Sequence, residues 1–333
     1  MAEGGTVRTV EELLVDGAAT KIWLAHLEEI GDPDFVVALP ENLAPTLLEL
    51  AVPHEDIDIL CAMAPKMWER PRLRWLLRRS MHSLVRTMGE VPRPPCFPSP
   101  AKDGDPLARY LFVFVFLAIL PHVKAFHLGL GIPAEISRLT LADLGRTMAA
   151  NRQQDGVGGL RTVDWLMSHF RGVIYQIGRL QFERATLGTR TGKAVQAAGE
   201  PFGPGDLTLA VHIPSRYGPL TPAACDDSFR AAGESFARYF PDEHYRTAVC
   251  HSWLLDPQLA DYLPADANII RFQRRFQQAY QPEADDATTQ LFVFGRTDLT
   301  LDELPGDTTL RRAVADHLKA GRHWHGSAGW LVL

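Results

Sequence analysis

The chain has 333 residues, of which 46% are hydrophobic and 22% are charged. This composition is typical of a soluble globular protein with one or two domains, and it excludes a disordered chain. The net charge of −6 gives no overall attraction to nucleic acid or to an anionic membrane, so neither is expected as a partner.

The first half of the sequence predicts helices. Apolar residues recur at spacings of three and four in "KIWLAHLEEIG", "LAPTLLELAV" and "PKMWERPRLRWLLRRSMHSLVRTMG". The last of these segments is basic on one side and apolar on the other, which is typical of a helix with a solvated face. The run "LFVFVFLAILP", Leu111 to Pro121, is too short to span a bilayer and predicts a buried helix that ends at its proline.

The second half changes character after "NRQQDGVGG", which we take as the boundary between a helical N-terminal domain, residues 1–155, and a second domain, residues 156–333. Segments that predict strands are "VIYQIGRLQFER", "LTLAVHI", "RTAVCHSWLL", "TQLFVFGR" and "GWLVL". "GTRTGKAVQAAGEPFGPGD" predicts an irregular connection, and "DANIIRFQRRFQQAY" predicts a helix with Ile269, Phe272, Phe276 and Tyr280 facing inward. The sequence therefore predicts an α+β fold, in which a helical domain precedes a mixed sheet flanked by helices.

The segment "VHIPSRYGPLTPAACDDSF" predicts a strand, a tight turn and a helix that starts near Pro222. Thr221 suits the N-cap of that helix, and Pro222 suits its first position. A helix N-terminus after such a turn can bind an anion through backbone N–H groups, and Gly218 and Arg216 would assist. Pro219 lacks a donor and no second glycine follows, so by itself the segment favours a plain connection between strand and helix.

A set of segments in the second half carries a family resemblance: "IGRLQFE", "VHIPSRYGPLTPAACDDSF", "YFPD", "CHSWLLDPQLADYLP" and "NIIRFQRRF". Together they resemble GNAT-like acyltransferases, in the branch that joins a helical N-terminal acyltransferase domain to a GNAT-like C-terminal domain. The resemblance implies an enzyme that uses acyl-CoA as co-substrate and transfers the acyl group directly to an amine of a small molecule. The helical half could then form one wall of the acceptor site or a homodimer contact. The resemblance implies that coenzyme A is held by residues of the turn and of the helices that follow: Ser215, Arg216, Gly218, Leu220, Thr221 and Asn268.

The sequence departs from ordinary members of that family in two places. Their turn reads Gln/Arg-x-x-Gly-x-Gly/Ala, whereas "SRYGPL" keeps only the first glycine. Their acid, a Tyr in the helix after Asn268, is replaced by Phe272 and Phe276, which leaves Tyr217 as the candidate acid; Asn268 itself could simply be an N-cap. These departures favour an alternative function, a non-catalytic GNAT fold that binds acyl-CoA or another ligand as a sensor or scaffold.

Polar residues on one face of the strand predicted from Val173 to Arg184 suggest a catalytic base. Arg179, Gln181 and Glu183 alternate with apolar residues and would share that face. Glu183 is the first choice as the base that takes a proton from the amine, and Arg179 and Gln181 are candidate substrate-binding residues. A structural ion pair between Arg179 and Glu183 explains the same pattern. His212, which lies beside the turn, is a second candidate base, or a residue that only hydrogen-bonds its neighbours.

The next predicted strand carries three further candidates. Ser252 and Cys250 share one face, whereas His251 points the other way. Ser252 is a candidate substrate contact, and a Ser252 or Cys250 nucleophile would make the chain a hydrolase, a third function. His323 and His325 have a spacing used by metal ligands, but no third ligand is adjacent in sequence, so no metal is expected. The four cysteines form no Cys-x-x-Cys pair and no signal-peptide pattern is seen, which favours a cytoplasmic location.

Overall fold

The computed structural model of the chain describes residues 14–15, 17–100, 106–280 and 283–333. The chain divides into two compact units, Met1–Tyr175 and Gln176–Leu333. The first unit thus extends past residue 155, and it includes a helix at Val163–Phe170. Each unit has a core of its own and is described separately.

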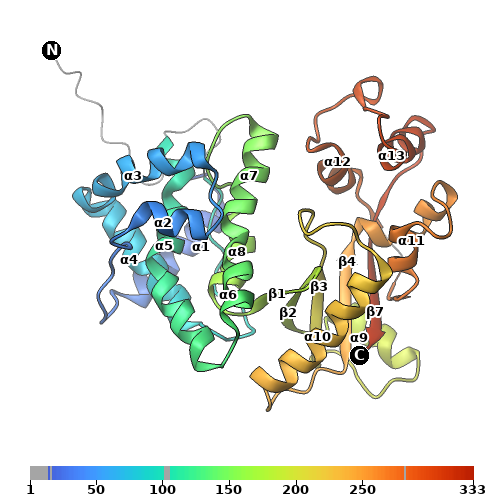
Figure 1. Cartoon of the computed structure of the whole chain (residues 1–333), viewed down its shortest axis with the longest axis horizontal. Coiled ribbons are helices and arrows are strands. Elements are labelled where there is room, and N and C mark those ends of the chain that lie inside the picture. Colours follow the sequence, from blue (N-terminus) through green and yellow to red (C-terminus); the bar gives the residue numbers. More distant parts are fainter. Residues whose placement is uncertain (1–13, 16, 101–105, 281–282) are drawn as a thin grey trace. The chain divides into compact units, whose positions relative to one another are not determined.

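The first unit is helical in its described part (Figure 1). Its helices are α1 (Ala18–Ile30), α2 (Leu43–Glu49), α3 (His54–Glu69), α4 (Pro71–Arg86), α5 (Pro106–Gly129), α6 (Ala134–Leu141), α7 (Asp143–Asp155) and α8 (Val163–Phe170). The segment predicted as one helix around residue 70 is divided between α3 and α4. Arg70 has extended backbone there, because a proline disfavours helical backbone at the residue before it.

Helix α5 lies in the core of the first unit. Every residue from Tyr110 to Leu120 is buried, which confirms the predicted buried helix. The prediction that this helix ends at Pro121 is wrong, because the helix continues to Gly129. Pro121 is exposed and costs about 3 kcal/mol in a helix interior, and burial of the turns on both sides outweighs that cost.

Length and composition make α5 the one helix in the described part of the chain that could cross a membrane. However, 67% of its most apolar window is buried inside the fold, as in the core helix of a soluble protein. Helix α4 packs against it with its apolar side, and the predicted apolar residues Leu73, Leu76, Leu77 and Leu84 are all buried.

The second unit is built on a mixed sheet in which seven strands are described, in the order β1-β2-β3-β4-β7-β5, with β6 paired to β7. The strands are β1 (Ile174–Ile177), β2 (Leu180–Thr186), β3 (Leu207–His212), β4 (Thr247–Ser252), β5 (Gln277–Gln278), β6 (Glu283–Ala284) and β7 (His325–Val332). The β3–β4 pair is parallel, whereas β2–β3 and β4–β7 are antiparallel. The α+β fold class predicted from the sequence is therefore confirmed.

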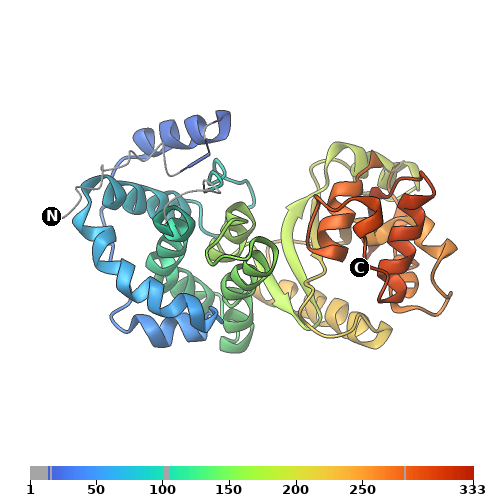
Figure 2. The ribbon, with the colours of Figure 1, turned by 90° about the horizontal axis from the view of Figure 1, so that it is seen from above.

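Helices cover both faces of this sheet. The helices of this unit are α9 (Thr189–Ala197), α10 (Pro222–Tyr239), α11 (Asn268–Gln273), α12 (Asp286–Phe294) and α13 (Thr309–Lys319), of which α9 and α10 pack on the two faces. Helix α10 packs on one face, where the rings of Phe182 and Phe229 meet at 5.5 Å. Helix α9 covers the other face, where Val195 joins a cluster with Val249 and Trp330. Helices α12 and α13 lie side by side in both views (Figures 1 and 2) and share a separate small core.

Two segments before β3 differ from the prediction. Val173 to Arg184 is not one strand but a hairpin, because Gly178 has φ 61° and turns the chain between β1 and β2. Arg179 follows that glycine in the turn, so it does not share the strand face of Gln181 and Glu183. The connection predicted as irregular contains α9, which the buried Val195 fixes against the sheet.

Two segments after β4 also differ. Helix α11 ends at Gln273, because residues 277–278 pair with β7 instead of continuing the helix. Its N-cap is Ala267, so the prediction of an N-cap at Asn268 is wrong by one residue. The predicted strand "TQLFVFGR" falls in α12, which Asp285 caps by accepting from the Thr288 N–H at 3.1 Å and which Gly295 ends with φ 79°.

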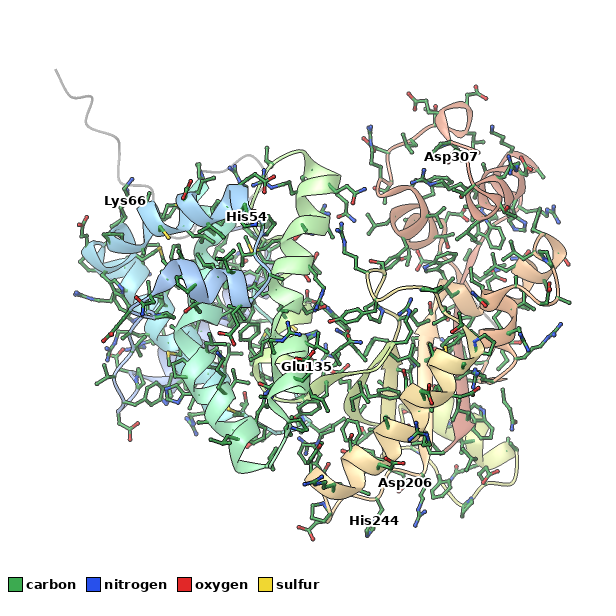
Figure 3. The ribbon with its side chains drawn as sticks, viewed as in Figure 1. His54, Lys66, Glu135, Asp206, His244 and Asp307 are labelled. Carbon is green, nitrogen blue, oxygen red and sulfur yellow. The ribbon has the colours of Figure 1, made fainter. Side chains whose placement is uncertain are left out.

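Charged side chains lie on the outside of both units. The labelled Lys66 and Asp307 show this in Figure 3, and both residues are exposed. Asp307 pairs with Arg311 one helical turn later at 3.0 Å. Such exposed pairs contribute little to stability, so the informative polar groups are those that the folds bury.

Candidate active site

One face of the sheet gathers ionisable side chains from three neighbouring strands. In the antiparallel β2–β3 register, Gln181 lies opposite His212 and Glu183 lies opposite Ala210. Directly opposed residues point to the same face, so Gln181, Glu183 and His212 share it. The parallel register of Ala210 with Val249 places His251 on this face as well, two residues beyond Val249.

Glu183 and His212 form the closest pair on this face. The Glu183 Oε2 atom lies 2.9 Å from His212 Nε2. The Glu183 side chain is only 8% exposed, whereas the His212 side chain is 28% exposed. A buried carboxylate thus orients an imidazole that solvent, and therefore an acceptor, can reach.

His251 belongs to the same group. The Tyr280 hydroxyl lies 3.4 Å from its Nδ1 atom. As a whole residue His251 is exposed, but nearby protein atoms desolvate its ring, which lowers its pKa. Positive charge on His212 lowers this pKa further. His251 therefore lies close enough to His212 for charge on His212 to lower the pKa of His251.

The parallel β3–β4 ladder is short. Its register comprises two residue pairs, Leu209–Ala248 and Ala210–Val249, whereas the β2–β3 and β4–β7 registers comprise six pairs each. Beyond Ala210 and Val249, the facing edges of β3 and β4 carry backbone groups that this ladder does not use. His212 lies where the ladder has ended, next to the turn that leads into α10.

The predicted turn and helix start are present. The Thr221 side chain accepts from the Ala224 N–H at 3.3 Å, and Pro222 occupies the first turn of α10, as predicted. Gly218 has φ 78°, a backbone conformation that L-residues rarely adopt. Within the predicted coenzyme set, Ser215, Arg216 and Gly218 are exposed, whereas Leu220 is buried.

Arg179 contacts this turn from the β1–β2 hairpin. Its Nε donates to the Gly218 carbonyl at 2.9 Å and its Nη1 donates to the Pro214 carbonyl at 2.8 Å. The alternative of an Arg179–Glu183 ion pair is therefore replaced by two separate arrangements, in which Glu183 pairs with His212 and Arg179 binds backbone carbonyls.

The candidate nucleophiles lie on the opposite face. Ser252 pairs with Ser327 of β7, and its Oγ accepts from the Leu254 N–H at 3.1 Å, which caps the short helix η2 (Trp253–Leu255). Cys250 is buried, and burial raises the pKa of its thiol to about 12, so it stays protonated. Neither shares a face with His212, which counts against a hydrolase.

The remaining predicted residues are dispersed. Tyr217 lies half-buried in the turn, and Asn268 is the first residue of α11. His323 and His325 contact different carboxylates, Asp286 at 2.6 Å and Asp256 at 3.3 Å. In the described residues no group of three or more His, Cys, Asp or Glu side chains could hold a metal ion.

The sequence left His251 as an alternative to Ser252, and Tyr280 was not selected as a site residue. Strand alternation separated His251 from Ser252, but the register that brings it beside His212 was needed to choose between them. Tyr280 was assigned to a helix, and it reaches His251 only because the chain leaves α11 and pairs with β7.

Comparison with family models gives one match for each unit. The model of the N-acyltransferase N-terminal domain matches residues 41–172, and the model of the GNAT-like C-terminal domain matches residues 174–331. A search of curated proteins gives no match.

Solved structures of acyltransferases are similar over nearly the whole chain. A mutant acyltransferase in complex with octanoyl-CoA is 40% identical, with a TM-score of 0.86, over 95% of this chain and 96% of that one. An acyltransferase in complex with decanoyl-CoA and teicoplanin is 40% identical over the same shares, with a TM-score of 0.84. A third, in complex with CoA and 10C-teicoplanin, is also 40% identical over 95% and 96%, with a TM-score of 0.86. The chain therefore belongs to the family of acyl-CoA-dependent acyltransferases that join an N-acyltransferase N-terminal domain to a GNAT-like C-terminal domain.

Proposed function

We propose that this enzyme moves an acyl group of octanoyl or decanoyl length from acyl-CoA to an amine of a teicoplanin-like small molecule. The observation that carries the chemistry is the Glu183–His212 pair, which lies where the β3–β4 ladder ends. The acyl length and the acceptor class are taken from the complexes of the similar structures.

His212 fits the role of base better than Glu183, the first choice from the sequence. An amine attacks a thioester only when it is neutral, so a group at the surface of the site has to accept its proton. The His212 side chain is the more exposed of the two, and the buried Glu183 carboxylate would stabilise the imidazolium that forms. Gln181, on the same face, remains a candidate contact to the acceptor.

Direct transfer then balances without a covalent enzyme intermediate. The C–N bond forms as the amine nitrogen attacks the thioester carbon, the amine proton passes to His212, and the C–S bond breaks. The departing thiolate takes a proton from an acid. Tyr217 in the turn stays the predicted acid, and Tyr280, which contacts His251, is a second candidate.

Coenzyme A is proposed to lie with its diphosphate at the turn between β3 and α10. The start of an 18-residue helix offers backbone N–H groups and the positive end of its dipole. Ser215, Arg216, Gly218, Leu220, Thr221 and Asn268 remain the proposed contacts to the coenzyme. The facing edges of β3 and β4 beyond their short ladder would accept the amides of the pantetheine arm.

Ligand binding and turnover test the proposal together. The melting temperature should rise with the logarithm of octanoyl-CoA or decanoyl-CoA concentration, as linkage requires for a ligand that binds the folded state. Release of free thiol should then require an amine acceptor, measured across a panel that includes teicoplanin-type compounds. Glu183→Gln should retain the thermal shift and lower kcat by about tenfold or more. An enzyme that shows neither a shift nor thiol release with any of these thioesters contradicts the proposal.

A non-catalytic role as an acyl-CoA sensor is the second candidate, and one observation favours it. The turn contains a single glycine, Gly218, followed by Pro219, so it offers fewer amides than the usual pattern. A sensor would show the same thermal shift but no thiol release with any acceptor. The thiol assay therefore separates the two functions.

A cytoplasmic location and a homodimer also remain proposals. The cysteines Cys61, Cys96, Cys225 and Cys250 are free in the fold, which suits a reducing compartment. Acyl-CoA supply is consistent with that compartment, and fractionation of cells would test it.

A further inference from the structure

The turn between β3 and α10 is held from outside by a buried arginine. Arg179 is only 9% exposed, and it donates to the carbonyls of Pro214 and Gly218 at the two ends of the turn. These bonds are charge-assisted and are therefore stronger than bonds between neutral groups. The shape of the turn thus depends on a residue that lies more than thirty positions earlier in the chain.

The position of Arg179 is itself fixed by α10. Its backbone N–H donates to Ser228 Oγ at 2.8 Å, and that hydroxyl donates to the Ala224 carbonyl at 2.7 Å. Gly178 allows this close approach, because a Cβ at that position would lie 2.6 Å from Ser228 Oγ. The hairpin turn, the first turns of α10 and the β3–α10 turn therefore form one connected assembly.

The carbonyl bonds also decide which backbone groups face outward. In a trans peptide the C=O and the following N–H point in opposite directions, so holding the Pro214 carbonyl towards Arg179 turns the Ser215 N–H away from it. The Gly218 carbonyl precedes Pro219, which has no N–H, and an exposed carbonyl at that point would repel an anion. Arg179 binds that carbonyl and removes the repulsion.

Arginines also border this place, although the Asp226 carboxylate of α10 offsets part of their charge. Arg275, which follows α11, donates to the Pro222 carbonyl at 3.0 Å and pairs with Asp226 at 2.5 Å. Arg216 lies exposed in the turn itself. The start of α10 is thus bordered by arginines from three separate segments.

We propose that Arg179 is a positioning residue for the diphosphate of coenzyme A, which compensates for the missing second glycine by orienting the turn and adding charge beside it. This inference rests on the proposed acyl-CoA binding at that turn. It differs from the sequence-based expectation, in which Arg179 contacts the substrate from the face of a strand. It also predicts that the effect of Arg179 depends on whether the thioester carries a diphosphate.

The test compares octanoyl-CoA with octanoyl-pantetheine, which has the same thioester but no diphosphate. For Arg179→Met, we expect kcat/KM with octanoyl-CoA to fall by about tenfold or more through KM, with kcat at saturation retained. The kcat/KM with octanoyl-pantetheine should be the same as in the wild type. Arg179→Lys should restore part of the loss, because it keeps the charge but donates in a different geometry.

Arg184 supplies the matched control. It is also a buried arginine near the start of the unit, but it pairs with Glu243 and packs on the ring of Phe240 at 4.0 Å. Arg184→Met should lower the melting temperature and leave the ratio of the two kcat/KM values as in the wild type. Ser228→Ala removes the acceptor for the Arg179 N–H but keeps the guanidinium. It should raise KM for octanoyl-CoA by a smaller factor than Arg179→Met does. If Arg179→Met does not fold, Ser228→Ala serves as the test in its place.

Equal losses with both thioesters in Arg179→Met or in Ser228→Ala would overturn the inference, since Arg179 would then only support the fold. A wild-type enzyme that consumes neither thioester would instead contradict the proposed function. The wild type could use octanoyl-CoA while the variants keep the wild-type ratio of kcat/KM for the two thioesters. That result would support the proposed function but would contradict a role of Arg179 in coenzyme binding.

Discussion

A carboxylate–histidine pair of the first unit and the Glu183–His212 pair of the second differ in their access to solvent. In the first unit, His169 Nε2 lies 3.3 Å from Asp143 Oδ2, and the two side chains are 0% and 9% exposed. Trp165 covers this pair: its Nε1 donates to Asp143 Oδ2 at 3.0 Å, and its carbonyl lies 3.2 Å from His169 Nδ1. In the second unit, the imidazole of His212 is 28% exposed. Carboxylate–histidine contact alone therefore does not identify a catalytic pair.

Exposure alone does not identify one either. The side chain of His323 is 66% exposed and lies 2.6 Å from Asp286, yet the same carboxylate accepts from the Trp324 N–H and so holds β7 against α12. What distinguishes Glu183–His212 is its place, on a sheet face beside the end of a short parallel ladder and a helix N-terminus. The location of a pair in the fold is thus the more informative criterion.

The largest expected effects come from replacing the histidines of the two pairs, His212 and His169. His212→Ala should lower kcat by about 100-fold or more, as for loss of a general base, with a small change in melting temperature. His169→Ala should do the reverse, lowering stability by about 3 kcal/mol because it leaves a cavity in the core and removes one of the contacts of a buried carboxylate. Steady-state kinetics and urea unfolding of both variants check this. A similar fall in kcat for folded His169→Ala would show that access does not separate the pairs.

His127 is a second buried histidine of the first unit, and its contribution to stability should depend on pH. His127 is buried against Ser137, and burial lowers its pKa from 6.5 to about 4. Between these values the unfolded chain binds a proton that the folded chain does not, so stability falls as pH is lowered from about 6.5 towards 4, by up to about 3 kcal/mol. In His127→Gln this contribution should be absent. Urea unfolding at pH 7 and pH 4.5 measures it, and an unchanged pH dependence in the variant would contradict the assignment.

The smallest expected effect concerns Tyr280, which contacts His251 in the candidate active site. Tyr280→Phe removes one hydrogen bond of 3.4 Å to His251, so kcat should change by about threefold or less and the melting temperature should stay within error. Kinetics over a range of pH would detect a displaced profile if Tyr280 affects His251. A loss as large as that of His212→Ala would instead make Tyr280 the acid in preference to Tyr217.

Sequence patterns among neighbouring residues predicted the helices whose position depends on those same neighbours. The apolar run of α5 and the Thr221 cap with Pro222 were identified because periodicity and capping are properties of neighbouring residues. The predicted strand "TQLFVFGR" failed, because aromatic and β-branched residues favour strands, while the cap at Asp285 decided for a helix.

The candidate site was predicted in part, and the errors have physical causes. Glu183 and His212 were each selected by alternation, but their contact follows from the antiparallel register of β2 and β3, which one sequence does not reveal. Arg179 was assigned to a strand face because one continuous strand was predicted, whereas Gly178 ends β1 and places Arg179 in the turn before β2. His251 needed the parallel register of β3 and β4, which joins segments separated by a helix and a turn.

Helix α5 also constrains how the chain is synthesised. Its apolar residues leave the ribosome before α8, which packs on them, has been translated. During that interval the nascent chain presents an uncovered aromatic surface that chaperones or other nascent chains would bind. A fragment that stops before Phe170 would keep that surface uncovered, so the first unit has to be produced at least to that residue.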